Sequence, residues 1–221
     1  MANKARQKQF AVLGLGHFGT SVALTLYDLG YQVLGVDMSE DIVQLLSHKL
    51  THVVTADVAD DNTLQSLGIK NYEVVVVAIG ELESSLMTTL LLKDMGVKFV
   101  VVKALNAMHG KMLEKIGADK IIYPERDMGM RVAHNLISSS IVDYIEMSDD
   151  ISLMSIKVPQ ALIGKNLIES ELRARYNVNI VAIKHAGATM VNPRPTQVLE
   201  QGDDIIIIGA HENVKALEEI V

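Results

Sequence analysis

The chain has 221 residues, a formal net charge of −7 and no cysteine. An acidic surface repels phosphate backbones, which argues against nucleic acid as a partner. The lack of cysteine excludes disulfides, thiolate metal sites and thiol catalysis. No apolar run reaches the roughly 18 residues needed to cross a bilayer, and no signal-peptide pattern follows the short polar N-terminal stretch. We therefore expect a cytoplasmic protein without direct membrane insertion.

The first two-thirds of the sequence alternates short β-branched runs with segments of helical periodicity. Strands are predicted over 10–13, 32–36, 52–55, 74–79, 99–102 and 120–123, and helices over 18–29, 40–50, 61–67, 84–95 and 108–116. Such alternation predicts an α/β fold, a Rossmann-like doubly wound parallel sheet with helical crossovers. Four glycines follow helical segments and suit left-handed C-caps, namely Gly30, Gly68, Gly96 and Gly117.

A further helix is predicted over 126–145. Its apolar stripe comprises Met128, Val132, Leu136 and Ile137, continued by Ile141 and Tyr144. Because no seventh parallel strand follows, this stripe needs another surface, such as a second subunit. From about residue 148 the pattern becomes a small α+β module, with strands over 153–158, 179–184, 189–192 and 204–208 and short helices over 169–175 and 212–220. We therefore predict a nucleotide-binding domain over 1–125, a crossover helix over 126–147 and a C-terminal domain over 148–221.

A glycine-rich run lies between the first predicted strand and the first predicted helix. It reads Gly14-Leu15-Gly16-His17-Phe18-Gly19, and Asp37 ends the second strand. In this context the first glycine makes a tight turn, the second lets the backbone approach a pyrophosphate, and the third lets helix pack on strand. The helix N-terminus offers free N–H groups to the phosphates. Asp37 suits two ribose hydroxyls and repels a 2′-phosphate, which disfavours NADP.

Residues at the other strand ends are expected to complete the pocket, because the carboxyl ends of parallel strands share one edge. Lys103 either directs a cation to the phosphates or caps its strand at the surface. Glu125 either binds a metal or a ribose or complements a helix dipole. The remaining candidates are Met38 beside Asp37, Ala56 and Asp57 near the adenine, and Ala78, Ile79 and Gly80 after the fourth strand.

No set of catalytic residues accompanies this pocket. None of the tyrosines is followed four residues later by lysine, and neither a Gly-x-Ser-x-Gly elbow nor a Walker loop occurs. His48 and His52 stand four residues apart, but a third metal ligand is not evident. We therefore predict no catalytic residues. A small NAD-dependent oxidoreductase stays open as an alternative, because the glycine run and Asp37 permit it.

Several longer runs resemble the RCK (regulator of potassium conductance) family, in particular the cytoplasmic subunits of Ktr-type and TrkA-like potassium uptake systems. These runs are FAVLGLGHFG, VLGVD, VVVVAIGE, VVVKA, LEKIGADKIIYPERDMG and LRARYNVNIVAIKH, and the resemblance covers nearly the whole chain. It implies an N-terminal Rossmann domain, a crossover helix and a small C-terminal domain. It also implies homodimers that assemble into an octameric ring beneath a membrane-embedded potassium-translocating subunit, at the inner face of the cell membrane.

The resemblance further implies ligands and their residues. ATP activates such proteins, ADP inactivates them, and NAD or NADH occupies the same cleft. Glu125 corresponds to a residue that holds a cation (Mg, Ca or Na) beside the phosphates. Many relatives bind cyclic di-AMP in the C-terminal domain, with an inhibitory effect on potassium uptake; the matching residues are Ile168, Arg173, Ala174, Tyr176, Asn179, Ile180 and Pro195. Read without the family, these are ordinary core and surface positions.

One residue departs from the family pattern. Many relatives carry arginine where this chain has His17, and that arginine reaches a terminal phosphate across the dimer interface. Histidine is shorter and mostly neutral at pH 7, so discrimination between ATP and ADP is in question here. A soluble cyclic di-AMP sensor acting on another partner stays open as a second alternative.

Overall fold

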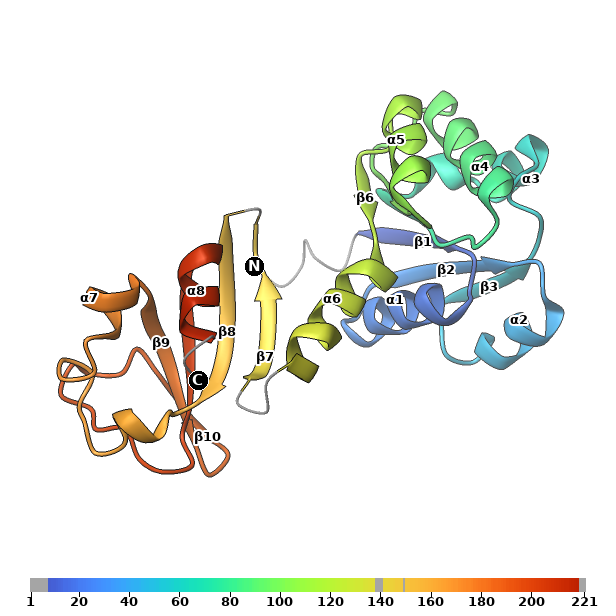
Figure 1. Cartoon of the computed structure of the whole chain (residues 1–221). Coiled ribbons are helices and arrows are strands. Elements are labelled where there is room, and N and C mark those ends of the chain that lie inside the picture. Colours follow the sequence, from blue (N-terminus) through green and yellow to red (C-terminus); the bar gives the residue numbers. More distant parts are fainter. Residues whose placement is uncertain (1–7, 138–140, 149, 219–221) are drawn as a thin grey trace. The chain divides into compact units, whose positions relative to one another are not determined.

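The computed structural model describes residues 8–137, 141–148 and 150–218. The chain forms two compact units, 1–124 and 125–221. In the first unit, strands and helices alternate (Figure 1). The strands are β1 (Gln9–Leu13), β2 (Gln32–Asp37), β3 (His52–Thr55), β4 (Val74–Val77), β5 (Val100–Lys103) and β6 (Lys120–Ile122). The helices are α1 (His17–Asp28), α2 (Glu40–Leu46), α3 (Asp61–Ser66), α4 (Leu82–Asp94) and α5 (Ala107–Ile116), with the short helix η2 (Ile69–Asn71).

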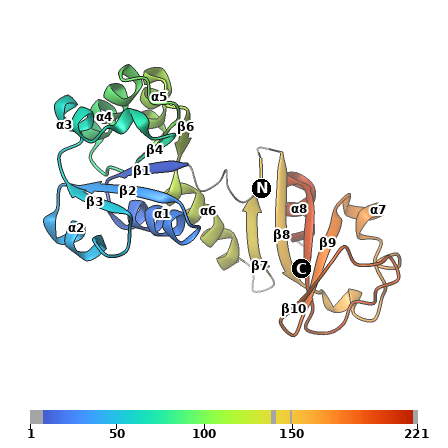
Figure 2. The ribbon, with the colours of Figure 1, turned by 180° about the vertical axis from the view of Figure 1, so that it is seen from behind.

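The six strands form one parallel sheet in the order β3-β2-β1-β4-β5-β6. This order places the switch in winding direction between β1 and β4, where Rossmann folds bind ligands. Helices α1 and α2 lie on one face of the sheet and α3, α4 and α5 on the other (Figure 1, and from behind in Figure 2). The predicted doubly wound fold is thereby confirmed.

Each face of the sheet has its own apolar core. Val12, Val33 and Val76 pack with Ala23 of α1 and Leu46 of α2. On the opposite face, strand residues pack against Leu64 of α3, Leu92 of α4 and Leu113 of α5. These strand residues are Ala11, Leu13, Val36, Val75 and Val77. A strand covered on both faces reads as a continuous apolar run, which explains the four valines of β4.

Four helices are each followed by a glycine with left-handed backbone geometry, as predicted. Gly30, Gly68, Gly96 and Gly117 have φ between +63° and +97°. Only glycine adopts this conformation without steric cost, so these residues allow each chain segment to turn from a helix towards the next strand.

The second unit begins with α6 (Pro124–Ile137), and the predicted helix over 126–145 is wrong in its second half. Residues Ile141–Glu146 form strand β7 instead, which pairs antiparallel with β8 (Ile151–Lys157). Arg131 of α6 and Asp143 of β7 form a two-pronged ion pair, with Nε–Oδ1 at 2.7 Å and Nη2–Oδ2 at 2.5 Å. Met128, Val132 and Leu136 of the predicted stripe are exposed on α6.

The rest of the unit is an antiparallel sheet in the order β10-β9-β11-β8-β7. Its further elements are η3 (Gln160–Leu162), α7 (Leu172–Tyr176), β9 (Asn179–His185), β10 (Ala188–Val191), β11 (Asp204–Ala210) and α8 (His211–Glu218). Helix α8 packs on β8 and β11, and α7 lies against α8. The core between them contains Met154, Ile156, Leu199, Ile205, Ile207, Val214 and Leu217. The predicted small α+β domain is confirmed, and its sheet starts at Ile141.

Candidate functional site

The glycine turn joins β1 to α1 at the switch point of the sheet. Gly14 has a φ of +90°, and its N–H donates to the carbonyl of Val36 at 2.8 Å. A Cβ on Gly14 would lie 3.0 Å from the backbone of Ala78 in the neighbouring connection. A Cβ on Gly19 would lie 1.9 Å from the carbonyl oxygen of Gly14. The close approach of helix α1 to this turn therefore depends on both glycines.

Gly16 differs from these two glycines. No heavy atom lies within 4 Å of a Cβ built on it, and its φ of −60° is accessible to any residue. Packing within the unit therefore does not require glycine here. His17 is exposed beside it and Phe18 is half-buried. Open space around Gly16 is what close approach of a phosphate to the backbone requires.

The N-termini of the five helices in this unit are not equivalent. Side chains accept hydrogen bonds from the first-turn N–H groups of α2, α3, α4 and α5, namely Ser39, Asp60, Glu81 and Asn106. Helix α1 has Gly16 at its N-cap, with no side-chain cap and no acidic residue in its first turn. The N–H groups of this turn have no partner within the helix. The N-terminus of α1 is thus left to an external anion.

Glu81 shows why the N-terminus of helix α4 is less suited to bind a phosphate. Its carboxylate accepts from the N–H groups of Ser84 at 2.6 Å and Glu83 at 3.0 Å. These hydrogen bonds, that from Ser84 foremost, lower the pKa of the Glu81 carboxyl. A carboxylate already occupies the anion position of α4, whereas α1 has no side chain at the corresponding position.

Asp37 ends β2 and braces the glycine turn. Its Oδ2 accepts from the N–H of Leu15 at 2.6 Å and its Oδ1 from the N–H of Ser39 at 2.9 Å. Each carboxylate oxygen can accept a second hydrogen bond, so the bracing role is compatible with binding ribose hydroxyls. The bond to Leu15 is a function of Asp37 that the sequence motif alone did not reveal.

The other predicted residues of the first unit follow its strands. Ala56 comes after β3, and its N–H donates to the carbonyl of Asp37 at 3.1 Å. Asp57 accepts from the N–H of Ala59 at 2.9 Å. The carboxyl edge of the sheet further carries Met38, Ala78, Ile79, Gly80 and the half-buried Lys103, the last residue of β5.

Glu125 is the first residue of the second unit and lies exposed in the first turn of α6. Within the described ranges, no three histidine, aspartate or glutamate side chains gather closely enough to hold a metal ion. A cation at Glu125 would therefore need oxygen ligands from elsewhere, such as nucleotide phosphates.

A cavity of about 800 Å³ opens in the second unit. Six of the seven residues predicted for cyclic di-AMP line it: Ile168, Arg173, Ala174, Asn179, Ile180 and Pro195. Tyr176 does not line the cavity. It packs against the core, with the Arg175 guanidinium 5.8 Å from its ring centroid.

Sequence reasoning missed part of this cavity. Its lining also contains Leu167, Ser170, Glu171, Leu172, Asn177, Val178 and Pro193. Glu171 and Asn177 flank α7 and both have a φ of 52°. An asparagine after a short helix is a known C-cap signal, so Asn177 had a readable signal. Glu171 had no such signal in the sequence.

Two protein families match the chain, one within each unit. The TrkA-N domain family matches residues 10–124 and the TrkA-C domain family matches residues 152–221. Across the described residues, no helix has the length and apolar character to cross a membrane.

Relatives resemble nearly the whole chain. Ktr system potassium uptake protein C of Bacillus subtilis is 43% identical over 216 residues, covering 97% of this chain and 98% of the relative. Ktr system potassium uptake protein A of the same organism is 41% identical, covering 97% of each chain. The protein A of Vibrio alginolyticus is 35% identical, covering 96% of each.

Solved structures with similar folds are more distant in sequence. The GsuK RCK domain aligns with a TM-score of 0.54 at 21% identity, covering 96% of this chain and 46% of that one. The C-terminal domain of Kef from Shewanella denitrificans, in an AMP-bound form, aligns with a TM-score of 0.53 at 21% identity, covering 59% and 80%. These likenesses show the fold. The two matching domain families and the full-length relatives show that the chain belongs to the TrkA-domain family of Ktr system potassium uptake proteins.

Proposed function

We propose that the chain is a non-enzymatic regulatory subunit of a potassium uptake system, controlled by nucleotides at its glycine turn. The uncapped N-terminus of α1, in contrast to the capped N-termini of α2, α3, α4 and α5, is the observation that supports this most directly. It offers N–H groups and a positive dipole end to phosphates. Asp37 would receive the ribose hydroxyls, and its charge would oppose NADP.

The ligands proposed for this site are ATP and ADP, with NAD or NADH as further occupants. Two proteins of similar fold are described as bound to NAD and to AMP, the GsuK channel and Kef. Lys103 would contact the terminal phosphates, and Glu125 would hold a cation beside them. Discrimination of ATP from ADP rests on His17, at the first position of α1.

The cavity of the second unit is the proposed site for cyclic di-AMP, whose binding would inhibit uptake. Arg173 is exposed on α7 at the cavity, where its guanidinium suits a phosphate. Ile168, Ile180 and Pro195 supply apolar surface for an adenine, and Asn179 supplies hydrogen-bonding groups. Mixed apolar and polar lining of this kind suits a nucleobase with attached phosphates.

Regulation requires that nucleotide binding at one place changes a contact at another. We propose that homodimers assemble into an octameric ring, which binds the membrane-embedded potassium-translocating subunit at the inner face of the membrane. The exposed Met128, Val132 and Leu136 of α6 fit a surface exchanged between subunits.

Small-angle scattering with light scattering on the purified full chain tests this proposal. We expect a ring whose dimensions differ between ATP and ADP, and co-purification with the potassium-translocating subunit. A stable monomer that is indifferent to both nucleotides would refute it. Turnover of a nicotinamide cofactor on a metabolite panel would instead favour an oxidoreductase.

A further inference from the structure

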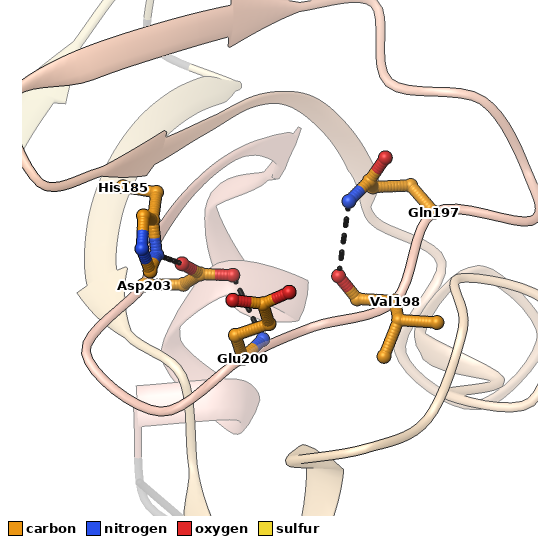
Figure 3. A network of polar contacts seen from close by, with 5 residues as sticks. All are labelled: His185, Gln197, Val198, Glu200 and Asp203. Carbon is orange, nitrogen blue, oxygen red and sulfur yellow. Dashed lines mark hydrogen bonds and ion pairs between the residues drawn. The ribbon is translucent and has the colours of Figure 1, made fainter.

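Asp203 is a buried carboxylate that holds a turn of the second unit. Its side chain is 3% exposed. Its Oδ1 lies 2.5 Å from Nδ1 of His185 at the end of β9, and its Oδ2 accepts from the N–H of Glu200 at 2.8 Å (Figure 3). Its backbone carbonyl accepts from the N–H of Val158, just after β8, at 2.8 Å. Asp203 therefore connects the 200–203 turn to both β8 and β9.

His185 is the histidine of this network, and its side chain is 54% exposed. The hydrogen bond to Asp203 raises the pKa of His185, as do the negative charges of Asp203 and Glu200. The other charged residues on the strands packed here are Lys184 of β9, Asp204 of β11 and Lys157 of β8; Asp204 pairs in register with both lysines. Histidine is the residue type among these that changes charge between pH 5 and 8.

The turn held by Asp203 continues into a wall of the cavity. The segment before it pairs with residues 164–168 through backbone hydrogen bonds: Gly164 N–H to Leu199 O at 2.8 Å, Leu199 N–H to Lys165 O at 2.9 Å, Leu167 N–H to Gln197 O at 3.1 Å and Ile168 N–H to Pro195 O at 3.2 Å. Leu199 is fully buried in the core. Leu167, Ile168, Pro193 and Pro195 line the cavity itself. Backbone hydrogen bonds therefore join the 195–199 segment, which leads into the turn, to the cavity wall.

We propose that His185 and Asp203 form a pH-sensitive latch, in which protonated His185 holds the 200–203 turn and, through the 164–168/195–199 ladder, the wall of the ligand cavity. A positive charge on His185 compensates the buried carboxylate. When the histidine loses its proton, the buried Asp203 side chain keeps only a neutral hydrogen-bond partner. The cavity then binds its ligand less tightly.

The direction of the pH dependence follows from the raised pKa of His185. The stabilising contribution is complete below the histidine pKa of the unfolded chain and is lost as the pH rises through the pKa of the folded chain. The latch is therefore closed in mildly acidic solution and open in alkaline solution. This inference rests on the proposed binding of cyclic di-AMP to the cavity.

Titration calorimetry of the full chain with cyclic di-AMP at pH 6 and pH 8.5 tests the latch. The affinity of the unchanged protein is expected to fall about two- to fivefold at the higher pH, the size typical of a partly exposed ion pair. His185→Gln should bind weakly at both pH values, and His185→Lys, which stays charged, tightly at both. Retention of the pH dependence by His185→Gln, or its absence in the unchanged protein, overturns the proposal.

Two histidines serve as controls. His211 lies in the same unit, with its Nδ1 3.0 Å from the Ser152 hydroxyl, and His48 is exposed in the first unit. His211→Gln and His48→Gln should each keep the pH dependence of the unchanged protein. If His211→Gln abolishes it, the latch is assigned to the wrong histidine.

A measurement without ligand separates this inference from the proposed ligand. Hydrogen exchange gives protection factors for the ladder amides of Leu167 and Leu199, corrected for the intrinsic effect of pH. They should fall from pH 6 to pH 8.5 in the unchanged protein but not in His185→Lys. If cyclic di-AMP binds at neither pH and protection still falls, the ligand assignment fails and the latch stands. If protection changes equally between pH 6 and pH 8.5 in the unchanged protein and in His185→Lys, the latch is refuted.

Discussion

The two units of this protein offer ligands different kinds of site. In the first unit the site is made mainly of backbone: the glycine turn, the uncapped start of α1 and a carboxylate, Asp37, that braces them. In the second unit the cavity is lined by side chains from three separated segments, 167–174, 177–180 and 193–195. A backbone site depends on which side chains are absent, and a side-chain site on which are present. Substitutions should therefore break the two sites in different ways.

The largest effect is expected from adding one methyl group to the turn. In Gly19→Ala the new Cβ would lie 1.9 Å from the Gly14 carbonyl oxygen, so backbone must move. We expect the free energy of unfolding of the first unit to fall by about 3 kcal/mol or more, measured by urea denaturation.

Gly16→Ala is the matched variant, because its Cβ meets no atom within 4 Å. It should leave stability unchanged within about 0.5 kcal/mol. It should nevertheless weaken nucleotide binding about tenfold, since the proposed ligand's phosphates would approach the backbone at this position. Equal loss of stability in both variants would contradict the distinction drawn between the two glycines.

An intermediate effect is expected in the second unit. Arg173→Ala removes the cavity's exposed guanidinium, and hydrogen bonds to charged groups contribute about 1.5–3 kcal/mol. Affinity for cyclic di-AMP should fall roughly 10- to 100-fold, measured by calorimetry.

Arg175 of the same helix lies over Tyr176, outside the cavity lining, and provides the control. Arg175→Ala should change the affinity by no more than about twofold. If the two variants lose affinity equally, net charge rather than contact governs binding.

The smallest effect concerns an ion pair of the first unit. Lys93 Nζ lies 2.8 Å from Oδ2 of Asp119, with side chains 24% and 28% exposed. Burial raises the pKa of Asp119, but the hydrogen bond from Lys93, that from the Val100 N–H and the lysine charge outweigh it, and the pKa is lowered. Because the pKa is lowered, the ionised carboxylate stabilises the fold at pH values above the usual aspartate pKa of 3.8. This stabilisation is lost as the pH falls through the pKa of the folded chain.

Lys93→Met should therefore reduce the free energy of unfolding by about 0.5–1 kcal/mol at neutral pH, and by progressively less in acid. Urea denaturation across this range measures it. Lys115→Met, on the exposed side of α5, should show no such trend. A loss that is constant with pH would mean that Lys93 acts through packing.

The fold of the first unit was almost completely predictable from the sequence, because the patterns that indicate its strands, helices and turns are local. The strands are short apolar runs, and four of the five crossover helices are followed by a glycine, so the order of elements and the place of the turn were predictable. The difference between the N-terminus of α1 and those of α2, α3, α4 and α5 was not predicted. Ser39, Asp60, Glu81 and Asn106 are individually readable caps, but their significance lies in the contrast with Gly16.

The second unit was less predictable because its signals are non-local. Residues 141–145 read Ile-Val-Asp-Tyr-Ile, which continues a helical stripe and equally suits a strand. Antiparallel pairing with β8 makes these residues a strand, and no local sequence pattern indicates that pairing. The cavity residues were found only through resemblance to a family. Tyr176 shows the limit of that route, because it packs against the core instead.

We propose that one chain carries two independent nucleotide sites. Calorimetric titration of the unchanged protein, Asp37→Ala and Arg173→Ala with ATP, ADP, NADH and cyclic di-AMP tests this independence. We predict that Asp37→Ala loses affinity for ATP, ADP and NADH alone, and that Arg173→Ala loses affinity for cyclic di-AMP alone. Loss of all four ligands in either folded variant, or no binding by the unchanged protein, would show that the chain does not carry two independent sites.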